Sequence, residues 1–459
     1  KPVGLALVRE WLRVGMVGAR LLFEALRLKG TMRGFYRRLN AALEKPASTL
    51  EEMSLSELAA EYRRIEASLL DRWDAPLVND FLCMMAFGAS RKLLEKWAGP
   101  AGLATHNDIM IGQGDIISAE PARRIATMAE TLSGHEELRA ELARGDGRNL
   151  GQLPVLEMAV ANYLEKFSDR CAEELKLESV PLNRDPSPLY MAIAAAALAP
   201  SGKAHPAQNK QTASTLESGL DELFAGRPLR RFVSGLIVGW AKTLVKNREN
   251  LRFERTRIFG RARHLFRAVG SQFFAHGLLE DADEIYYLSV SEVLGTIEGF
   301  AISAEIGALA GLRRAEMQAA GKRPDPAERI VVRGAAFARS GPVAGAKPAT
   351  PGDATSQTGT GCSAGKVTAV ARIVRDPRKQ SINRGEILVA RHTDPGWIAL
   401  FCNASAIVVE RGSLLSHSAI VARELGIPCV VGLKGAMDWI VDGETIEVDG
   451  ATGVVRRLK

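Results

Sequence analysis

One histidine near the C-terminal end has neighbours that suit phosphoryl chemistry. His417 lies between Ser416 and Ser418, in the segment Gly-Ser-Leu-Leu-Ser-His-Ser-Ala-Ile-Val-Ala-Arg that begins at Gly412. A neutral imidazole can attack phosphorus and carry a phosphoryl group as a covalent intermediate. Taken alone, a histidine in such a place is more often a helix cap or a surface residue, so the spacing by itself leaves both interpretations open.

The residues around His417 predict that it begins a helix. A tight turn at Gly412 precedes Ser416, which is a good N-cap residue, and Gly426 is a typical helix stop. In the first turn the N–H groups have no intrahelical partners, and the helix dipole adds about half a positive charge. A phosphoryl group on His417 would meet an anion site there. The same dipole disfavours imidazolium, so we expect the pKa of His417 to be lowered.

Two arginines in the N-terminal region are candidates for contacts with substrate or phosphate. Arg248 and Arg252 are four residues apart, so they share one face of a helix. Two guanidinium groups on one face can hold a transferring phosphoryl group. Glu249 and Glu254 lie close by in sequence, so a purely structural ion-paired role is equally compatible with the pattern.

Arg170 and His106 are weaker candidates. Arg170 is followed by Glu173 and Glu174, a pattern that favours a structural ion-pair cluster over a catalytic role. His106 and Asp108 can form a general base pair for a substrate hydroxyl. They belong to a polar, turn-rich segment, so a structured loop between helices is the favoured interpretation.

The chain has two regions of different predicted secondary structure, joined by a segment of different composition, and these must position the candidate residues. Residues 1–321 predict helix after helix, since apolar residues recur at three- and four-residue spacing, and Ser54 with Glu57 forms a capping box. Residues 322–360, rich in Pro, Gly, Ala, Ser and Thr, predict a flexible linker. Residues 361–459 predict a small α+β module. Its strands are expected at 366–374, 386–390, 406–410, 429–431 and 445–448, with a helix at 418–425.

Composition sets further bounds. The net charge of +7, from 60 Lys and Arg against 53 Asp and Glu, suits anionic small substrates, and no dense basic block interleaved with aromatics indicates nucleic acid. Five scattered cysteines without a C-x-x-C pair predict reduced thiols in a cytoplasmic protein, and no cluster has metal-ligand spacing. Residues 1–29 are apolar but interrupted by arginines, which favours an amphipathic core helix over a membrane-surface helix and predicts no membrane span.

The segment around His417 closely resembles the phosphohistidine signature of the PEP-utilising enzymes, which include pyruvate phosphate dikinase, PEP synthase and rifampicin phosphotransferase. The match covers residues 412–428 and departs at Ser413, where the family usually has a second glycine. The resemblance implies that His417 carries the phosphoryl group. The residues expected to position this group are Ser416, Ser418, Gly412 and Arg423.

The resemblance extends over the rest of the module, through the segments 361–372, 385–397 and 448–453. It implies the swivelling β/β/α fold, which carries a phosphorylated histidine between two active sites. The expected architecture is therefore multidomain, with a large, mostly α-helical domain followed by a small swivelling β/β/α phosphohistidine domain.

The helical region resembles the substrate domains of rifampicin-phosphotransferase-like proteins, at residues 163–186 and 248–292. Residues 168–171 read Ser-Asp-Arg-Cys where drug-modifying members tend to read Gly-His-Arg-Gly, which puts an antibiotic substrate in doubt. The resemblance implies an ATP-grasp domain, with ATP and Mg²⁺, that phosphorylates His417. Because the chain begins at Lys1, we expect that donor domain to lie outside it, on the same or a partner polypeptide.

The expected function is transfer of a phosphoryl group on His417 to a small-molecule acceptor in the helical domain. One alternative is a PEP synthase-like or pyruvate dikinase-like activity with a separate pyruvate site. The lack of a PEP-binding barrel after the histidine domain argues against it. Another alternative is a non-catalytic binding protein that retains the fold, although the intact Ser-His-Ser-Ala-Ile-Val-Ala-Arg segment argues against such decay.

Overall fold

The computed structural model describes residues 5–110, 117, 120–198, 214–301, 303, 305–323, 355–377 and 380–458. Helices make up the regular structure of the described residues before 324, as the three- and four-residue spacing predicts. These helices are α1 Leu5–Ala42, α2 Leu55–Ile65, α3 Asp74–Ile109, α4 Glu120–Thr131, α5 Glu136–Ala143, α6 Pro154–Phe167, α7 Ser187–Ala197, α8 Ser214–Leu223, α9 Pro228–Ala275, α10 Val290–Glu298 and α11 Ile306–Gly321.

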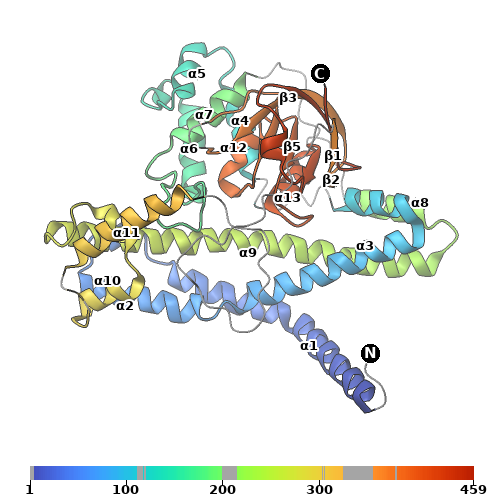
Figure 1. Ribbon diagram of the computed structural model, residues 1–459, viewed down its shortest axis with the longest axis horizontal. Helices are drawn as coiled ribbons and strands as arrows, with labels where there is room; N and C mark the ends of the chain where they lie inside the picture. The colour runs from blue at the N-terminus through green and yellow to red at the C-terminus, as the bar shows by residue number, and fades with distance from the viewer. Residues whose placement is uncertain are drawn as a thin grey trace.

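Helix α9 is the longest of these helices. Its 48 residues correspond to about 72 Å at 1.5 Å per residue. Helix α3 runs beside it, while α4 to α7 form a separate group of helices on one side (Figure 1). Helix α3 is broken at Gly99, which has a φ of 59°, and its last turns fold back onto the preceding ones. The long α9 therefore gives one continuous surface on which the other elements assemble.

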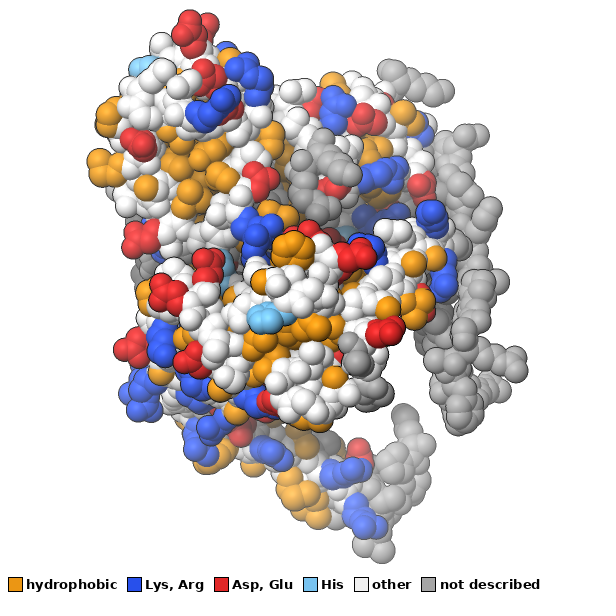
Figure 2. Space-filling view, turned by 90° about the vertical axis from the view of Figure 1, so that its left-hand side faces the viewer, with side chains coloured by type: hydrophobic (Ala, Val, Ile, Leu, Met, Phe, Trp, Pro, Cys, Tyr) orange, Lys and Arg blue, Asp and Glu red, His pale blue; other side chains and the backbone are white. Residues whose placement is uncertain are grey.

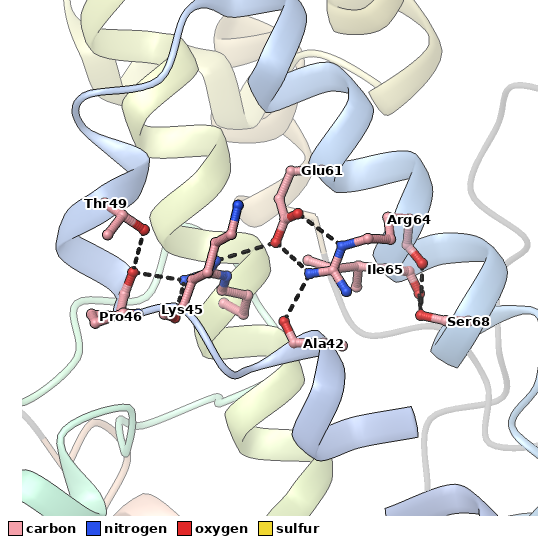
Figure 3. A network of polar contacts seen from close by, with 9 residues as sticks. Ala42, Lys45, Pro46, Thr49, Glu61, Arg64, Ile65 and Ser68 are labelled. Atoms are coloured by element: carbon pink, nitrogen blue, oxygen red, sulfur yellow. Dashed lines mark hydrogen bonds and ion pairs between the residues drawn. The ribbon is translucent and has the colours of Figure 1, made fainter. Parts of the chain in front are cut away.

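A buried ion network fastens α2 to α9 (Figure 3). Helix α2 begins with the predicted capping box, in which Ser54 and Glu57 exchange hydrogen bonds. One turn further, the buried Glu61 accepts a hydrogen bond of 3.2 Å from the buried Arg261 of α9 and pairs with Arg64 at 2.7 Å. Arg64 also donates to the Ala42 carbonyl at the end of α1. The Glu61 carboxylate therefore links α2 directly to α9, and Arg64 extends this network to α1.

Removing that carboxylate charge should destabilise the helical region. Glu61→Gln would leave Arg261, only 4% exposed, without its counter-charge, and an uncompensated buried charge costs about 3 kcal/mol. The free energy of unfolding in urea should fall by roughly that amount. Glu298→Gln is the matched control, because its pair with Arg63 is largely solvated and contributes little to stability. Equal losses in both variants would contradict this assignment.

The first half of α1 differs from the expected core helix. Trp11, Met16, Leu22 and Leu26 are each more than 60% exposed, and this end of the helix projects from the body of the molecule (Figures 1 and 2). The amphipathic pattern is real, but burial begins only at Leu28, where α1 reaches the other helices. Among the described residues, none of the helices combines the length and the hydropathy that a membrane span requires.

The C-terminal region is a mixed eight-stranded sheet in the order β1-β8-β7-β3-β4-β5-β6-β2. Strands β3 to β6 run parallel in that order, and the remaining neighbours pair antiparallel. The strands and short helices are β1 Ser356–Thr358, β2 Thr360–Ser363, β3 Lys366–Val374, β4 Ile387–Ala390, α12 Ile398–Phe401, β5 Ala406–Val409, α13 His417–Leu425, β6 Cys429–Val431, α14 Ala436–Trp439, β7 Thr445–Asp449 and β8 Val454–Arg457.

The sheet must curl, because β1 and β2 are consecutive in the chain but lie at opposite ends of the strand order. The short connection between β1 and β2 accordingly contacts both ends: the Gly359 N–H donates to the Gly453 carbonyl just before β8 at 2.9 Å, and Gly359 packs against Val430 and Val431 of β6. Strand β1 and the start of β2 lie inside the segment predicted as a linker, so that prediction was wrong for residues 356–360. Pairing with β8 and β6 orders them, and sequence pattern alone does not reveal such distant partners. Residues 324–354 of the predicted linker lie outside the described residues.

The sheet region packs directly against the helical region. One apolar cluster runs from α4, α6 and α7 into the sheet side, where it includes Trp397, Phe401 and Val421. A second cluster joins Ile420 of α13 to the core between α3 and α9. Helix α13 therefore faces the helical region with its first turn, and that turn holds His417 (Figure 1).

Candidate phosphohistidine site

His417 is the first residue of α13, as predicted, and Gly426 ends the helix with a φ of 65°. Ser416 occupies the N-cap position, but its hydroxyl does not cap the helix. Its Oγ donates to the Ser413 carbonyl at 2.8 Å and lies 3.1 Å from the Ser418 Oγ. The hydroxyl thus stabilises the turn before the helix, which leaves the first N–H groups of α13 without a side-chain cap.

The His417 side chain is buried between the two regions of the chain, with 4% of its surface exposed. Its ring is stacked on Phe401, with centroids 6.2 Å apart. Its Nδ1 lies 3.8 Å from Oε2 of Glu249 on α9, which is within ion-pair reach but too long for a hydrogen bond. Among the described residues, neither ring nitrogen has a hydrogen-bond partner. The Nε2 nitrogen is thus not tied to a protein group of the described structure.

The pKa of His417 is lowered, as expected, but for a different main reason. Burial is the largest cause, because it disfavours the charged imidazolium. Glu249 opposes this effect, and the nearby charges of Arg252 and Arg170 add to it. The neutral, nucleophilic imidazole is therefore favoured by the docking of α13 onto the helical region, rather than mainly by the helix dipole.

Arginines of α9 surround Glu249 and His417. Arg248 donates to the Leu415 carbonyl at 2.8 Å, so it contacts the turn just before the histidine. It also lies 3.4 Å from Glu249, and Arg252 lies 3.6 Å from the same carboxylate. The structural and the phosphate-binding interpretations of this pair are therefore compatible. Both arginines pair with Glu249, and both also lie near His417. Arg255, which was not among the predicted site residues, interacts electrostatically with Arg252 and Glu249. Its spacing of three from Arg252 could have indicated that it lies on the same helix face.

Arg170 forms the predicted ion-pair cluster, and its charge also reaches His417. Its Nη1 lies 3.2 Å from Glu174, which accepts a hydrogen bond of 2.7 Å from Thr256 of α9. The guanidinium packs over the rings of Phe167 and Phe253. Arg170 is therefore held rigidly and lies 5% exposed at the boundary between the two regions.

Arg423 was expected to position the phosphoryl group and His106 to contact the substrate, but both side chains are used in the packing of the fold. Arg423 is 3% exposed and donates from Nε to the Cys362 carbonyl at 2.7 Å, which fixes α13 to β2. Arg423 is six residues after His417 and so points to a different side of the helix. The predicted loop around His106 is helical, since it belongs to the last turns of α3. His106 is fully buried, bonded to Ser90 at 2.9 Å, and burial lowers its pKa to about 4. We assign Arg423 and His106 to the packing of the fold.

Gly412 lies in the turn before α13, where an added Cβ would approach Ser416 Oγ and Val431 within 3.3 Å. A small residue is needed there for the turn to pack against β6. The geometry therefore keeps Gly412 and Ser416 beside the first turn of α13, with Ser418 joined to Ser416. These three residues remain predicted to position a phosphoryl group.

A second contact between the two regions was not predicted. Asp394 lies in the loop between β4 and α12, and its Oδ2 accepts a hydrogen bond of 2.7 Å from the backbone N–H of Glu173. Glu173 has a φ of 57°, which is unusual for a residue other than glycine. Beside it, Gly396 packs so tightly on the Cys171 carbonyl that a Cβ would overlap that oxygen. Together these residues seat the sheet region on the helical region.

Two parts of the chain match protein-family models. Residues 382–453 match the PEP-utilising enzyme, mobile domain, and residues 77–249 match the rifampicin phosphotransferase fourth domain. The predicted resemblance to PEP-utilising enzymes is confirmed. The histidine therefore lies in the part that is similar to the mobile domain, and the arginines that surround it lie on helices similar to a rifampicin phosphotransferase domain or directly beyond them.

Individual relatives agree with these matches. An uncharacterized protein of Mycobacterium tuberculosis is 29% identical over 73% of this chain and 33% of its own length. Rifampicin phosphotransferase of a Streptomyces species is 25% identical over 80% of this chain and 42% of its own length. A probable phosphoenolpyruvate synthase of Staphylothermus marinus is 44% identical over 21% of this chain and 11% of its own length. The chain thus spans less than half the length of the relatives it matches.

Two buried groups should give docking of the sheet region opposite pH dependences. Burial raises the pKa of Asp394 to about 6, so its contribution strengthens docking as pH falls through 6 and is lost above it. The pKa of His417 is lowered, so docking weakens as pH falls through the free value of about 6.5. Asp394→Asn should therefore undock between pH 6.5 and 5, while His417→Gln should dock more tightly over the same range.

Energy transfer between dyes on two exposed positions can report this docking. Leu229→Cys on α9 and Val441→Cys on the sheet region are suitable sites, because both side chains are more than half exposed and the five native cysteines are buried. Slopes of the same sign in the two variants would contradict the assignment of the two titrating groups.

Proposed function

We propose that this chain holds the carrier and acceptor sides of a phosphohistidine-dependent phosphotransferase. His417 is the carrier, and the docked arrangement is the one in which it delivers its phosphoryl group. The observation that supports this proposal best is the insertion of His417, 4% exposed, among Arg248, Arg252 and Arg170. A phosphoryl group carries up to two negative charges, and these guanidinium groups can compensate them.

Glu249 would act as a positioning residue in this reaction. Because it faces Nδ1, it favours the tautomer with a proton on Nδ1 and leaves Nε2 to carry the phosphoryl group. In the transfer step an acceptor oxygen attacks phosphorus, the Nε2–P bond breaks, and its electron pair returns to the ring. Arg248 and Arg252 would hold the charge that spreads over the equatorial oxygens.

The donor side of the reaction lies outside this chain in our proposal. An ATP-grasp domain, with ATP and Mg²⁺, would phosphorylate His417 while the sheet region is undocked, since docking buries the imidazole. The part of the predicted linker that precedes β1, residues 322–355, would serve as the linker for this swivelling movement. Among the described residues, no three His, Cys, Asp or Glu side chains converge as metal ligands, so we assign none of them to Mg²⁺.

A chase experiment tests the acceptor side. Full-length protein is labelled from γ- or β-labelled ATP, freed of nucleotide and mixed with pyruvate or with a panel of hydroxyl and carboxylate compounds. We expect acid-labile, base-stable label that leaves the protein only with an acceptor bound in the helical region. Release to pyruvate would instead support the PEP synthase-like alternative. Protein that takes up no label from either nucleotide would favour a non-catalytic binding role.

A further inference from the structure

A cavity of about 70 Å³ lies where the helical region meets the sheet region. Helices α4, α6 and α7 and the loop of residues 170–182 form one wall, and Pro377, Pro395 and Gly396 of the sheet region form the other. Its walls are mainly apolar. The described residues that line it include Ile125, Tyr163, Val180, Leu182, Leu189 and Arg170. The cavity is complete only when the sheet region is docked, because both regions contribute to it.

Arg170 connects this cavity to the phosphohistidine site. Among the described lining residues it is the one with a charged side chain. It is 5% exposed, its Nη1 is used by Glu174, and its Nε has no partner in the described structure. A buried N–H without a partner costs free energy that a ligand oxygen would recover. The charge of the same guanidinium acts on His417.

We infer that this cavity binds the phosphoryl acceptor, and that the acceptor is a small apolar carboxylic acid. The inference rests on the proposed function of His417. Apolar walls favour a hydrocarbon body, and a single buried guanidinium favours one anionic oxygen over a neutral hydroxyl or a second charge. The cavity volume favours a compact molecule. Arg170 would direct the carboxylate toward the phosphoryl group on His417.

The chemical step balances without a further reactant. One carboxylate oxygen forms a bond to phosphorus as the Nε2–P bond breaks, and the bond electrons return to Nε2. The imidazole keeps its proton on Nδ1 and becomes neutral, so no base must remove a proton from the acceptor. The product is an acyl phosphate. A hydroxyl acceptor would instead need a base, and Glu249, whose Oε2 lies 3.8 Å from the His417 Nδ1, already pairs with Arg248 and Arg252.

Calorimetric binding of 4-methylpentanoate to the full chain tests this assignment. Succinate, which lacks the apolar body, and 4-methylpentan-1-ol, which lacks the charge, are the comparison probes. We expect the acid to bind at least tenfold more tightly than either. Arg170→Gln should weaken its binding at least tenfold, and so should Val180→Trp, which fills the cavity mouth from a side chain that is 46% exposed. Val155→Trp is the control for a new surface tryptophan, since Val155 is 61% exposed on α6 and is not among the lining residues.

Binding of the acid that survives Arg170→Gln and Val180→Trp would overturn the assignment, as would equal binding of the alcohol or no binding of the acid. These outcomes are independent of the proposed function, because binding requires no phosphorylation. Labelling of His417 from ATP should remain unchanged in Val155→Trp. Failure to label His417 in the unaltered protein would contradict the proposed phosphotransferase function, whatever the cavity binds.

Discussion

His417→Gln is expected to abolish phosphoryl transfer, with a loss on the order of 10⁴-fold or more, because no other group replaces a covalent carrier. Glutamine fills much of the imidazole volume and keeps a hydrogen-bonding end, so α13 should still dock against Phe401 and Glu249. The structure should therefore survive while the chemistry stops. Turnover of ATP coupled to acceptor phosphorylation is the quantity to measure.

His392→Gln is the matched control for that loss. His392 also lies in the sheet region, in the same loop between β4 and α12 as Asp394, but its side chain is exposed. We expect its activity to stay within about twofold of the unaltered protein. If both histidine variants lost activity alike, the effect would come from the fold of the sheet region rather than from a phosphoryl carrier.

Gly396→Val should separate the two halves of the reaction. A Cβ at residue 396 would overlap the Cys171 carbonyl, and a backbone oxygen cannot move aside as a flexible side chain can. The sheet region would then be held off the helical region, and displacement by about 1 Å can cost 10²-fold in rate. We expect transfer to the acceptor to fall at least 100-fold, while labelling of His417 by ATP continues at its normal rate.

Single-turnover release of label from the phosphorylated protein measures this second effect. Gly239→Ala on α9 is the control, because an added Cβ there meets nothing within 4 Å. Transfer at the normal rate in Gly396→Val would show that the docked arrangement is not the delivering one. Loss of labelling together with transfer would point to misfolding of the loop between β4 and α12.

The local structure around His417 was largely predictable from sequence. The turn at Gly412, the helix start at His417 and the stop at Gly426 depend on residues within a few positions of each other, and all three are found. Strands 366–374 and 429–431 also match their predicted ranges, because their apolar patterns are local. The helix that begins at His417 and these strands therefore follow from short-range signals, whereas the fold of the sheet region and the carrier role were expected from the resemblance to the PEP-utilising enzymes.

The surroundings of His417 were not predictable in the same way. Glu249 was noted only as an ion partner for its neighbouring arginines, and no spacing rule links it to a residue 168 positions away. Burial, which is the main cause of the lowered pKa, exists only because two distant regions dock. The contact of Asp394 with Glu173 and the exposure of Trp11 likewise depend on tertiary packing. The carrier candidate is therefore recognisable in the sequence, but the docked site that receives it is not.

Mapping the phosphoryl group by tandem mass spectrometry tests the central claim most directly. Full-length protein is incubated with ATP, digested under mildly basic conditions that preserve phosphohistidine, and fragmented. We predict a single phosphoryl group on His417, absent from His417→Gln and present in His392→Gln. A phosphoryl group on another residue, or equal labelling of His417→Gln, would contradict the proposal that His417 is the carrier.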